Sequence, residues 1–416
     1  MTQQKSERCE LPKTRRKTGS TVKVAPSRGG KATPVEQQAS QLNLLFETAE
    51  NPTARAAGVS ARVDADRSAP TPREAPKSRN TKSNSLSATM QEVCEQLSQA
   101  FSKVESNRGV AGPDRQSVEQ VREHWPDILP ALTTSLLDGT YRPGDIRRVW
   151  LPKATGGVRG LGIPNVIDRV VQEAVRRVLE PLYEPTFHEA SHGFRPKRSC
   201  HTALERARSF FEDGNEWVVD LDLERFFDRV HHQRLLSRLS QRVKDKPLLS
   251  LIGRMLRARV VMPDGVVVGT DEGVPQGGPL SPLLSNIVLD ELDTELSRRG
   301  LRFVRYADDC NIYVRSEAAG ARVLASMTQF LEERLKLNVN AAKSAVAQPW
   351  HRKFLGYSLT AHKAPKLRIA PTSIERLKAK VGEVFRRGRG CSLGKTIVVL
   401  NPILRGWAAY FKLTET

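Results

Sequence analysis

The stretch FVRYADDCNIYV, residues 303–314, places two adjacent aspartates, Asp308 and Asp309, inside an otherwise apolar run. FVRY and NIYV each have the aromatic and β-branched character of a short strand, so the stretch predicts a hairpin with the acids at its tip. Adjacent carboxylates at a tip repel each other unless a cation lies near them. An isolated pair of this kind is also compatible with a plain polar turn, and the surrounding sequence decides between the two.

A second strand-like segment, WVVDLDLERFFDRV at 217–230, also ends in acids. An Asp on a strand beside the hairpin would complete a cluster that binds two divalent ions about 3.5 to 4 Å apart. Such a site activates an attacking 3′-hydroxyl and neutralises the charge on a leaving pyrophosphate. Carboxylate oxygens that share ligands with substrate phosphates favour Mg²⁺. If the two segments meet in the fold, they form a site for nucleotidyl transfer with two Mg²⁺ ions; if they do not, the acids of the hairpin form a plain polar turn.

The composition limits the class of partner. The 416 residues carry 66 Lys and Arg against 46 Asp and Glu, a formal charge of +20, which indicates a polyanionic partner and favours nucleic acid. No apolar run approaches the roughly 18 to 20 residues that span a bilayer, and no secretory signal pattern opens the chain, so we expect no membrane partner and a cytoplasmic location. The five cysteines form no CxxC pair and read as reduced thiols.

The chain divides by composition near residue 85. Residues 1–85 are basic, rich in Pro, Ser and Thr, and predict a mobile tail that either grips phosphates or is a solvated extension without a specific role. The remainder is a mixed α+β pattern. We expect helices at about 87–105, 115–137, 165–180, 199–213, 230–258, 281–298, 317–336 and 373–387, and strands in RRVWLPK, WVVDLDL, VVMPDGVVVGT, the two arms of 303–314, LNVN with SAVAQ, and FLGYSLT.

Seven motifs in sequence resemble the reverse transcriptases encoded by bacterial group II introns. YADD at 306–309 follows GVPQGGPLSPLLSNIVLDEL at 273–292, and the resemblance runs from ESNRGVAGPD to RGWAAYF, over roughly three quarters of the chain. The other motifs are YRPGDIRRVWLPKATGGVRGLGIP, SHGFRPKRSCHTAL, DLDLERFFD, LKLNVNAAKSAV and KFLGYSL. The resemblance implies a right-hand polymerase with fingers, a palm made of a small antiparallel sheet backed by helices, and a partial helical thumb.

The resemblance also implies roles for single residues of the palm. Asp222 is the carboxylate of the first palm strand, and it joins Asp308 and Asp309 as catalytic and metal-binding residues. Asp220 and Asp228 are then not ligands. Phe227 matches the aromatic residue that excludes a ribose 2′-hydroxyl, the alternative being simple core packing of the pair Phe226 and Phe227.

Four further residues are implied to bind the incoming nucleotide. Lys153 and Arg159, on either side of a glycine-rich turn, match the fingers residues that cover the triphosphate. Gly160 stands where many relatives have proline, which leaves the stiffness of the fingers open. Gln276 matches the residue beside the nucleotide sugar and template base. Lys343 matches a triphosphate contact, with a solvated surface lysine as the equal alternative.

Two other patterns predict sites that we reject. HEASH at 188–192 satisfies a zinc-protease pattern, but nearby Pro and Gly residues argue against the helix that it requires. GRGCSLGKT at 388–396 approaches a phosphate-binding loop, but Arg389 occupies the position of the first glycine and a helix precedes it, so we interpret it as a basic linker.

The sequence therefore predicts a basic tail (1–85), fingers and palm (86–370) and a partial thumb or maturase region (371–416). We expect an RNA-directed DNA polymerase that binds an RNA template, a DNA primer, dNTPs and its parent intron RNA, with a maturase role in splicing and mobility. The region after 371 is shorter than in the family pattern, so we expect an incomplete maturase region. The alternatives are a non-enzymatic RNA-binding splicing factor and the reverse transcriptase of another bacterial element.

Overall fold

The computed structural model describes residues 88–152, 157–362 and 364–415. The predicted tail, residues 1–85, and Lys153 lie outside the described residues. No helix of the described part is long and apolar enough to cross a membrane.

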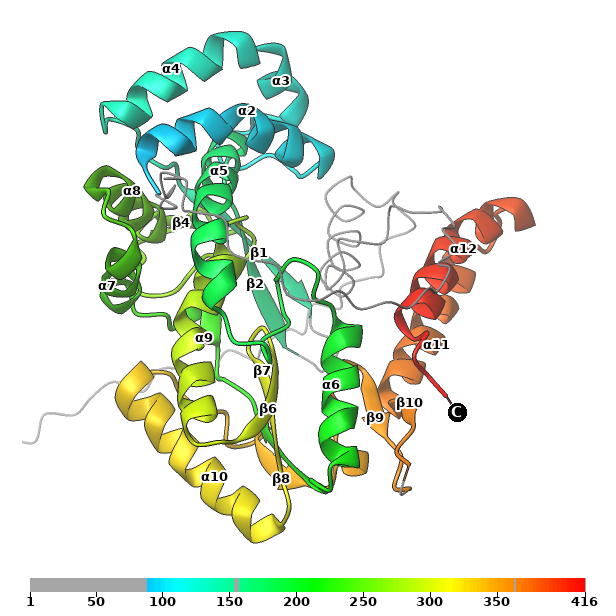
Figure 1. The fold of residues 1–416 in the computed structure, drawn as a ribbon. Helices are drawn as coiled ribbons and strands as arrows, with labels where there is room; N and C mark the ends of the chain where they lie inside the picture. Colours follow the sequence, from blue (N-terminus) through cyan, green and yellow to red (C-terminus); the bar gives the residue numbers. More distant parts are fainter. Residues whose placement is uncertain (1–87, 153–156, 363, 416) are drawn as a thin grey trace, which may run out of the picture.

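The N-terminal helices pack around one long helix. Helix α2 (Met90–Ser106) begins at Thr89, whose side chain accepts the N–H of Glu92 while the Glu92 carboxylate accepts the N–H of Thr89, so that each residue caps the other. Its apolar stripe packs against α5 (Val166–Tyr183), of which Val166, Val170, Val171 and Val175 are fully buried. The two helices form the base of the part that we call the fingers (Figure 1).

Two predicted long helices are each broken in two. The expected helix at 115–137 consists of α3 (Val118–Glu123) and α4 (Trp125–Leu137), and the one at 230–258 consists of α7 (His232–Arg242) and α8 (Lys246–Leu256). A proline stands in the first turn of α4 and of α8, where its missing N–H costs nothing but cannot continue a preceding helix. Both predictions were wrong because apolar periodicity continued across the breaks.

The fingers sheet has the order β2-β1-β4-β5. Strand β1 (Ile146–Pro152) pairs antiparallel with β2 (Val158–Ile163), and the short strands β4 (Val260–Val261) and β5 (Val267–Val268) extend the other edge. The prediction missed β2 because its glycines replace every second side chain and so hide the alternation that marks a strand.

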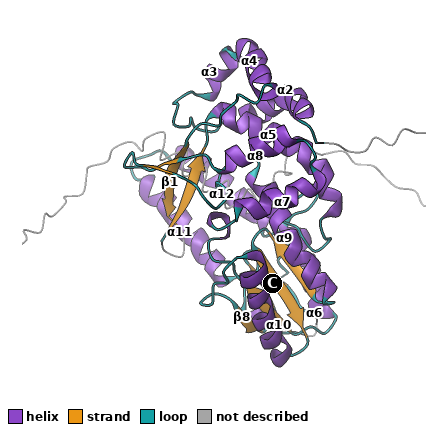
Figure 2. Cartoon of the chain, turned by 90° about the vertical axis from the view of Figure 1, so that its left-hand side faces the viewer, coloured by secondary structure: helices purple, strands orange, loops and turns teal. Residues whose placement is uncertain are grey.

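The palm sheet is antiparallel throughout, in the order β6-β7-β3-β8. Its strands are β6 (Arg302–Tyr306), β7 (Asp309–Val314), β3 (Trp217–Leu221) and β8 (Ala345–Ala347). Helices α9 (Ser281–Arg298) and α10 (Glu317–Phe330) bury one face, and α6 (Cys200–Glu212) buries the other (Figure 1). Figure 2 shows β1 and β8 in different parts of the molecule, so the fingers and palm sheets are separate.

The palm differs from the prediction at one strand. The sequence predicts strands at 337–340 and 344–348, but of these only Ala345–Ala347 forms a strand, and Val339 makes a single bridge to Leu223. The end of the expected helix 317–336 is a π-helical turn, Leu331–Leu335. Within the described residues, short 3₁₀ turns lie at Glu184–Thr186, Phe226–Asp228 and Pro349–His351.

The C-terminal part is a hairpin followed by two helices. Strands β9 (Tyr357–Leu359) and β10 (Leu367–Ile369) pair antiparallel and lead into α11 (Pro371–Arg387) and α12 (Leu393–Tyr410), which we call the thumb helices. The end of α12 is tied back to the palm, because its Tyr410 carbonyl accepts hydrogen bonds from the Tyr357 hydroxyl (2.6 Å) and pairs with His201 of α6. The structure confirms a mixed α+β fold with a small antiparallel palm sheet backed by helices.

Candidate active site

Asp222 stands at the end of the central palm strand. Val219 and Leu221 of β3 point into the core, and Asp222 is the first residue after the strand, half-buried. Its backbone is held on both sides: its N–H donates to the Ser344 Oγ (3.0 Å), and its carbonyl accepts the N–H of Asn340 (2.9 Å). The carboxylate position is therefore determined by the strand and by the segment that leads into β8.

Asp308 and Asp309 lie at the tip of the β6–β7 hairpin, as predicted. The turn residue Ala307 has a left-handed backbone (φ +56°), and Asp309 begins β7 opposite Tyr306. The β3–β7 pairing sets Leu221 opposite Cys310, so continuing that register by one residue brings Asp222 opposite Asp309. All three predicted acids thus belong to one end of the palm sheet.

Asp308 shares an electrostatic neighbourhood with two other predicted residues. Burial raises the pKa of the Asp308 carboxyl above its usual range, and the Asp222 carboxylate raises it further. A backbone hydrogen bond and the Arg159 guanidinium act in the opposite direction. The end of the palm sheet, through Asp222, and the fingers strand β2, through Arg159, thus both act electrostatically on the Asp308 carboxyl.

The carboxylates at this edge are suitable ligands for a divalent cation, but they do not by themselves form a complete metal-binding site. Among the residues that the structure describes, no group of three or more His, Cys, Asp or Glu side chains could hold a metal ion. Asp222 and Asp308 nevertheless repel each other, and oxygen donors of this kind suit a hard cation such as Mg²⁺. The residues present therefore fit an ion that is shared with substrate oxygens.

Lys343 lies beside the acids. Its Nζ is 3.5 Å from the Asp222 Oδ2, and 63% of its side chain is exposed. The ammonium group thus offsets charge at the sheet edge while remaining free to move. This position is compatible with the predicted triphosphate contact and equally with a solvated surface lysine.

Asp220 has a separate partner. Its Oδ2 accepts hydrogen bonds from the Nε (2.9 Å) and Nη2 (2.5 Å) of Arg352. Burial raises the pKa of Asp220, and Arg352 opposes that effect. Asp220 is therefore occupied by an ion pair, in agreement with the expectation that it is not a ligand.

The fingers hairpin explains why residue 160 is glycine. Gly160 lies opposite Trp150 in the β1–β2 pairing. A Cβ there would stand 2.5 Å from the Arg148 Nη1 and 2.9 Å from the Trp150 ring. The space that a larger residue would need is taken by these two side chains. Arg159 precedes it on β2 and is exposed.

The PQGG turn is attached to the fingers strand. The Gln276 carbonyl accepts the N–H of Gly162 on β2 (2.6 Å). Gly277 has φ +122°, and a Cβ on it would stand 2.3 Å from the Gly162 oxygen. Gln276 is thereby positioned between the palm and the fingers, with its side chain half-buried.

Phe227 lies next to the same turn. Phe226 is buried in the core and meets the Phe227 ring edge-on, with the ring centroids 5.2 Å apart. Phe227 is half-buried, and its carbonyl accepts the N–H of Val274 (2.6 Å). Of the two rings, Phe226 is the core residue, and Phe227 keeps an exposed part beside the segment that leads to Gln276.

Both rejected patterns lack the required local structure. Residues 188–192 form turns and a single bridge, not a helix; His188 stacks on Phe303, and His192 pairs with the Thr202 hydroxyl (2.8 Å). GRGCSLGKT follows the helix α11, as expected, and its first five residues connect α11 to α12. Its last four residues, however, begin α12, capped by Ser392, so the linker prediction was wrong for 393–396.

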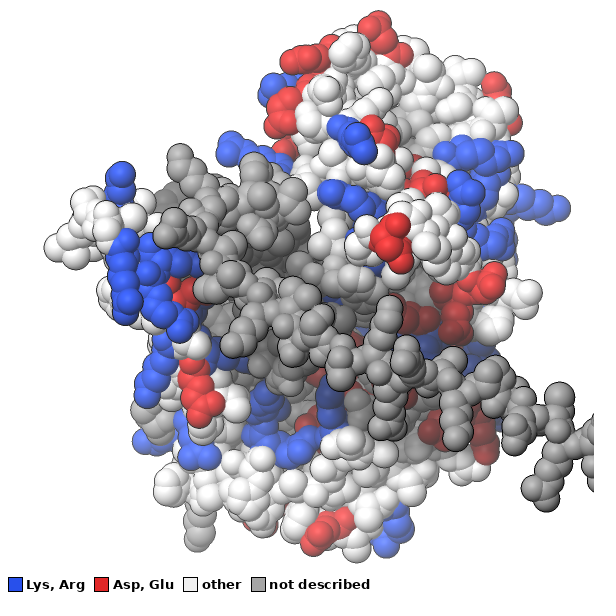
Figure 3. Space-filling model, turned by 180° about the vertical axis from the view of Figure 1, so that it is seen from behind, with Lys and Arg blue, Asp and Glu red and all other residues white. Residues whose placement is uncertain are grey.

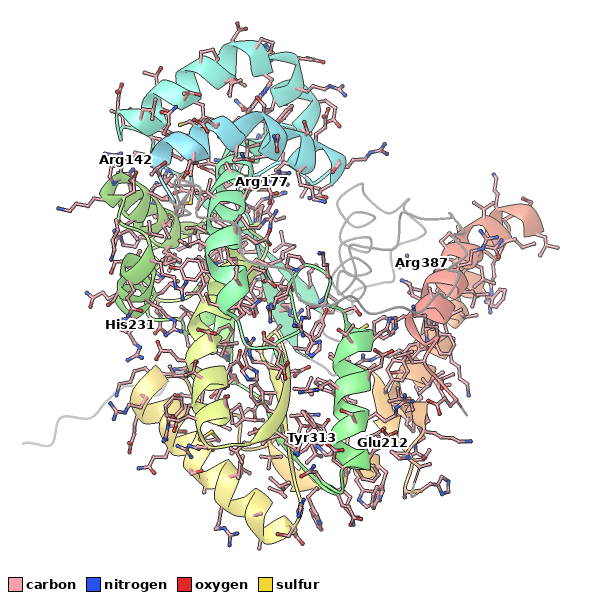
Figure 4. The ribbon with its side chains drawn as sticks, in the orientation of Figure 1. Arg142, Arg177, Glu212, His231, Tyr313 and Arg387 are labelled. Carbon is pink, nitrogen blue, oxygen red and sulfur yellow. The ribbon has the colours of Figure 1, made fainter. Side chains whose placement is uncertain are left out.

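Basic side chains gather on the thumb helices, at the left of Figure 3. Figure 4 labels one of them, Arg387, on α11. The exposed cations of α11, α12 and their connection are Arg376, Lys378, Arg386, Arg387, Arg389, Lys395 and Arg405. This surface suits a phosphate backbone.

Sequence reasoning missed the most deeply buried charge. Arg305, in the β6 arm of the quoted stretch, is fully buried and forms an ion pair with Asp293 of α9 (2.6 Å). An Arg flanked by apolar residues in a strand is the signal that was available, since a buried charge requires a partner.

Comparisons with known proteins agree with these features. The family model described as reverse transcriptase (RNA-dependent DNA polymerase) matches residues 151–359, and the group II intron maturase-specific domain matches residues 374–416. Protein YkfC of Escherichia coli K12 is 34% identical over 256 residues, which cover 52% of this chain and 67% of YkfC. The group II intron-encoded protein LtrA of Lactococcus lactis is 43% identical over 178 residues, which cover 42% of this chain and 29% of LtrA.

Among solved structures, the partial Cas6-RT-Cas1–Cas2 complex aligns with a TM-score of 0.38 and 22% identity, over 58% of this chain and 42% of that chain. The reverse transcriptase model covers half of the present chain and includes both acidic strands and the PQGG turn. The predicted family and its right-hand α+β fold are confirmed. This protein belongs to the reverse transcriptase family of RNA-dependent DNA polymerases, and its residues 374–416 match the group II intron maturase-specific domain.

Proposed function

We propose that the protein is an RNA-directed DNA polymerase of a group II intron that extends a DNA primer on an RNA template. The observation that carries the proposal is the strand register, which places Asp222 opposite Asp309 and next to Asp308 at one end of the palm sheet; the Arg159 guanidinium of the fingers also acts on the Asp308 carboxyl. Two carboxylates and a cation from the fingers are what the transfer of a nucleotide requires, because charge on both the attacking and leaving oxygens has to be balanced.

Asp222, Asp308 and Asp309 would hold the divalent ions, expected to be two Mg²⁺. When bound, such ions lower the pKa of the primer 3′-hydroxyl and neutralise the leaving pyrophosphate. The same three carboxylates orient the primer end, since each is fixed by the strand that precedes or follows it.

The nucleotide would be bound between fingers and palm. Arg159 and Lys153 donate to the triphosphate oxygens, and an Arg fork can bind two oxygens at once. Lys343, which lies beside Asp222, contacts the triphosphate of the incoming nucleotide. Gln276 lies under the sugar and template base, and Phe227 excludes a 2′-hydroxyl and so selects dNTPs.

We assign the parts of the chain as predicted: a basic tail at 1–85, fingers and palm at 86–370, and a thumb or maturase region at 371–416. The basic face of the thumb helices and the match to the maturase-specific domain support binding of intron RNA, with a role in splicing and mobility. A cytoplasmic location remains part of this proposal.

Primer extension tests the proposal. Purified protein with poly(rA), oligo(dT), dTTP and Mg²⁺ should synthesise DNA, and Arg159→Gln should raise the KM for dTTP. Arg142→Gln is the matched control, because Arg142 is exposed and binds only backbone carbonyls of Gly139 and Tyr141 among the described contacts. If wild-type protein makes no DNA with any divalent ion yet binds intron RNA tightly, the protein is a splicing factor and the polymerase proposal fails.

A further inference from the structure

The turn that carries Asp308 has an unfavourable backbone. Ala307 has φ +56°, in the left-handed region that residues with a Cβ adopt rarely. Such a conformation persists only where surrounding contacts determine it. Because Ala307 directly precedes Asp308, its backbone angles also set the direction of the Asp308 side chain.

A buried guanidinium lies under this turn. The Arg305 Nε and Nη2 bind the two carboxylate oxygens of Asp293 (2.7 and 2.6 Å). Nη1 donates to the Asn286 Oδ1 (3.0 Å) and to the Ala307 carbonyl (2.9 Å), and Nη2 also donates to the Ser191 Oγ (2.7 Å). All five N–H groups of the guanidinium are therefore used. One of them holds the turn directly.

The same network reaches the other side of the turn. Asn286 of α9 donates its Nδ2 to the Gly193 carbonyl (2.9 Å). Gly193 lies so close to the turn that a Cβ on it would stand 2.2 Å from the Ala307 nitrogen. Ala307 is therefore enclosed between Arg305 on one side and Gly193 on the other, and α9 supports both.

We propose that the buried Arg305–Asp293 pair is a positioning element of the polymerase site, which holds the Ala307 carbonyl and thereby aims Asp308 at the primer end. The inference rests on the proposed function. Arg305 does not touch substrate; it acts through the turn.

Stability alone does not account for the pair. In the described part of the chain it is the one ion pair whose two side chains are both 0% exposed. Removing two charges from water is costly, and replacing a buried pair with apolar residues of similar volume is often neutral or stabilising. What an apolar pair cannot supply is the hydrogen bond to the Ala307 carbonyl. The pair is thus explained by the geometry that it imposes.

The double variant Arg305→Met with Asp293→Leu separates the two roles, because it leaves no buried charge unpaired. We expect it to fold with a melting temperature near that of wild type. Its kcat for extension of oligo(dT) on poly(rA) should fall about 100-fold, as for a misplacement of about 1 Å at a reacting centre. The KM for dTTP should change little, since the fingers and PQGG contacts remain.

The matched control is Arg238→Met with Asp290→Leu. Arg238 and Asp290 join α7 to the same helix α9 at 2.6 Å, Arg238 also pairs with Glu291 (3.0 Å), and none of these described contacts involves the turn. This variant should keep the wild-type kcat. Arg305→Lys is the second test: it keeps the charge but cannot make the five bonds at once, so its kcat should lie between those of wild type and the double variant.

If the double variant Arg305→Met with Asp293→Leu, or the single variant Arg305→Lys, folds and keeps the wild-type kcat, the inference is overturned while the proposed function stands. If the double variant does not fold, Arg305→Lys decides. If neither folds, the pair is needed for the fold itself and the positioning role is wrong. If wild-type protein makes no DNA, the proposed function fails and this inference fails with it.

Discussion

Gly193→Ala is expected to disable the polymerase site by moving the turn that carries Asp308. A Cβ at position 193 would stand 2.2 Å from the Ala307 nitrogen and 3.0 Å from the Ala307 Cα. The closer contact must open to the 3.4 Å at which ordinary van der Waals contact begins, a shift of about 1 Å. Both partners are backbone atoms, so neither can yield by a change of rotamer.

Two magnitudes follow from this shift. Overpacking of this kind lowers the free energy of unfolding by about 1 to 3 kcal/mol. A displacement of about 1 Å at the reacting centre lowers kcat about 100-fold. The loss of activity should therefore far exceed what the unfolded fraction explains, because the protein remains mostly folded.

Steady-state extension of oligo(dT) on poly(rA), run beside urea unfolding of the same preparations, measures both quantities. Gly269→Ala is the control, since a Cβ at that exposed glycine would have no atom within 4 Å. A folded Gly193→Ala protein with the kcat of wild type would refute the reasoning, because it would show that the turn tolerates displacement.

Three further predictions concern sugar selection, RNA binding and pH. Phe227→Val should raise the incorporation of ribonucleotides relative to deoxynucleotides, measured by paired rNTP and dNTP extension; an unchanged ratio in folded protein would make Phe227 a core residue only. Affinity for structured RNA should fall as salt rises, and each phosphate neutralised should add about 0.7 to 0.9 to the magnitude of the slope of log K against log salt concentration. Replacing Lys378, Arg386 and Arg387 with Gln should reduce the magnitude of that slope by roughly 2. Burial lowers the pKa of His192 from 6.5 to about 4. As pH falls, the unfolded chain therefore binds the proton before the folded chain does. The free energy of unfolding should decline by roughly 3 kcal/mol between about pH 6.5 and pH 4. His192→Gln should lack this pH-dependent loss of unfolding free energy, measured by urea titration at each pH. An equal loss in wild type and His192→Gln would contradict the lowered pKa of His192.

The sequence predicted the palm better than the fingers, for physical reasons. In the hairpin at 303–314 and the strand at 217–221, apolar residues either alternate with polar ones or form a continuous run, so the hydrophobic pattern of a β-strand is visible in the sequence. Strand β2 contains Gly160 and Gly162, where a Cβ would come too close to Arg148, Trp150 and Ile146 of the paired strand β1. Those close contacts arise from the pairing of the two strands, and the local sequence pattern of β2 does not show them.

Residue roles show the same limit. The motif order identified Asp222 and the YADD acids, and the strand end explains why Asp222 rather than Asp220 lies at the edge. The partner of Asp220 is Arg352, 132 residues later, and no periodicity links the two. The burial of Arg305 likewise depends on α9 packing over the palm sheet, which only the folded chain brings about.

The central claim is that the acids at the palm edge carry out DNA synthesis on an RNA template. Asp308→Asn keeps the volume of the side chain but removes one negative charge from the edge, and Asp228→Asn makes the same change at an exposed residue of the turn Phe226–Asp228. Primer extension on poly(rA) and oligo(dT) with Mg²⁺ should fall by orders of magnitude in Asp308→Asn and remain at the wild-type level in Asp228→Asn, while both variants bind RNA as wild type does. If Asp308→Asn synthesises DNA as fast as wild type, the acids of YADD form only a turn and the account is wrong.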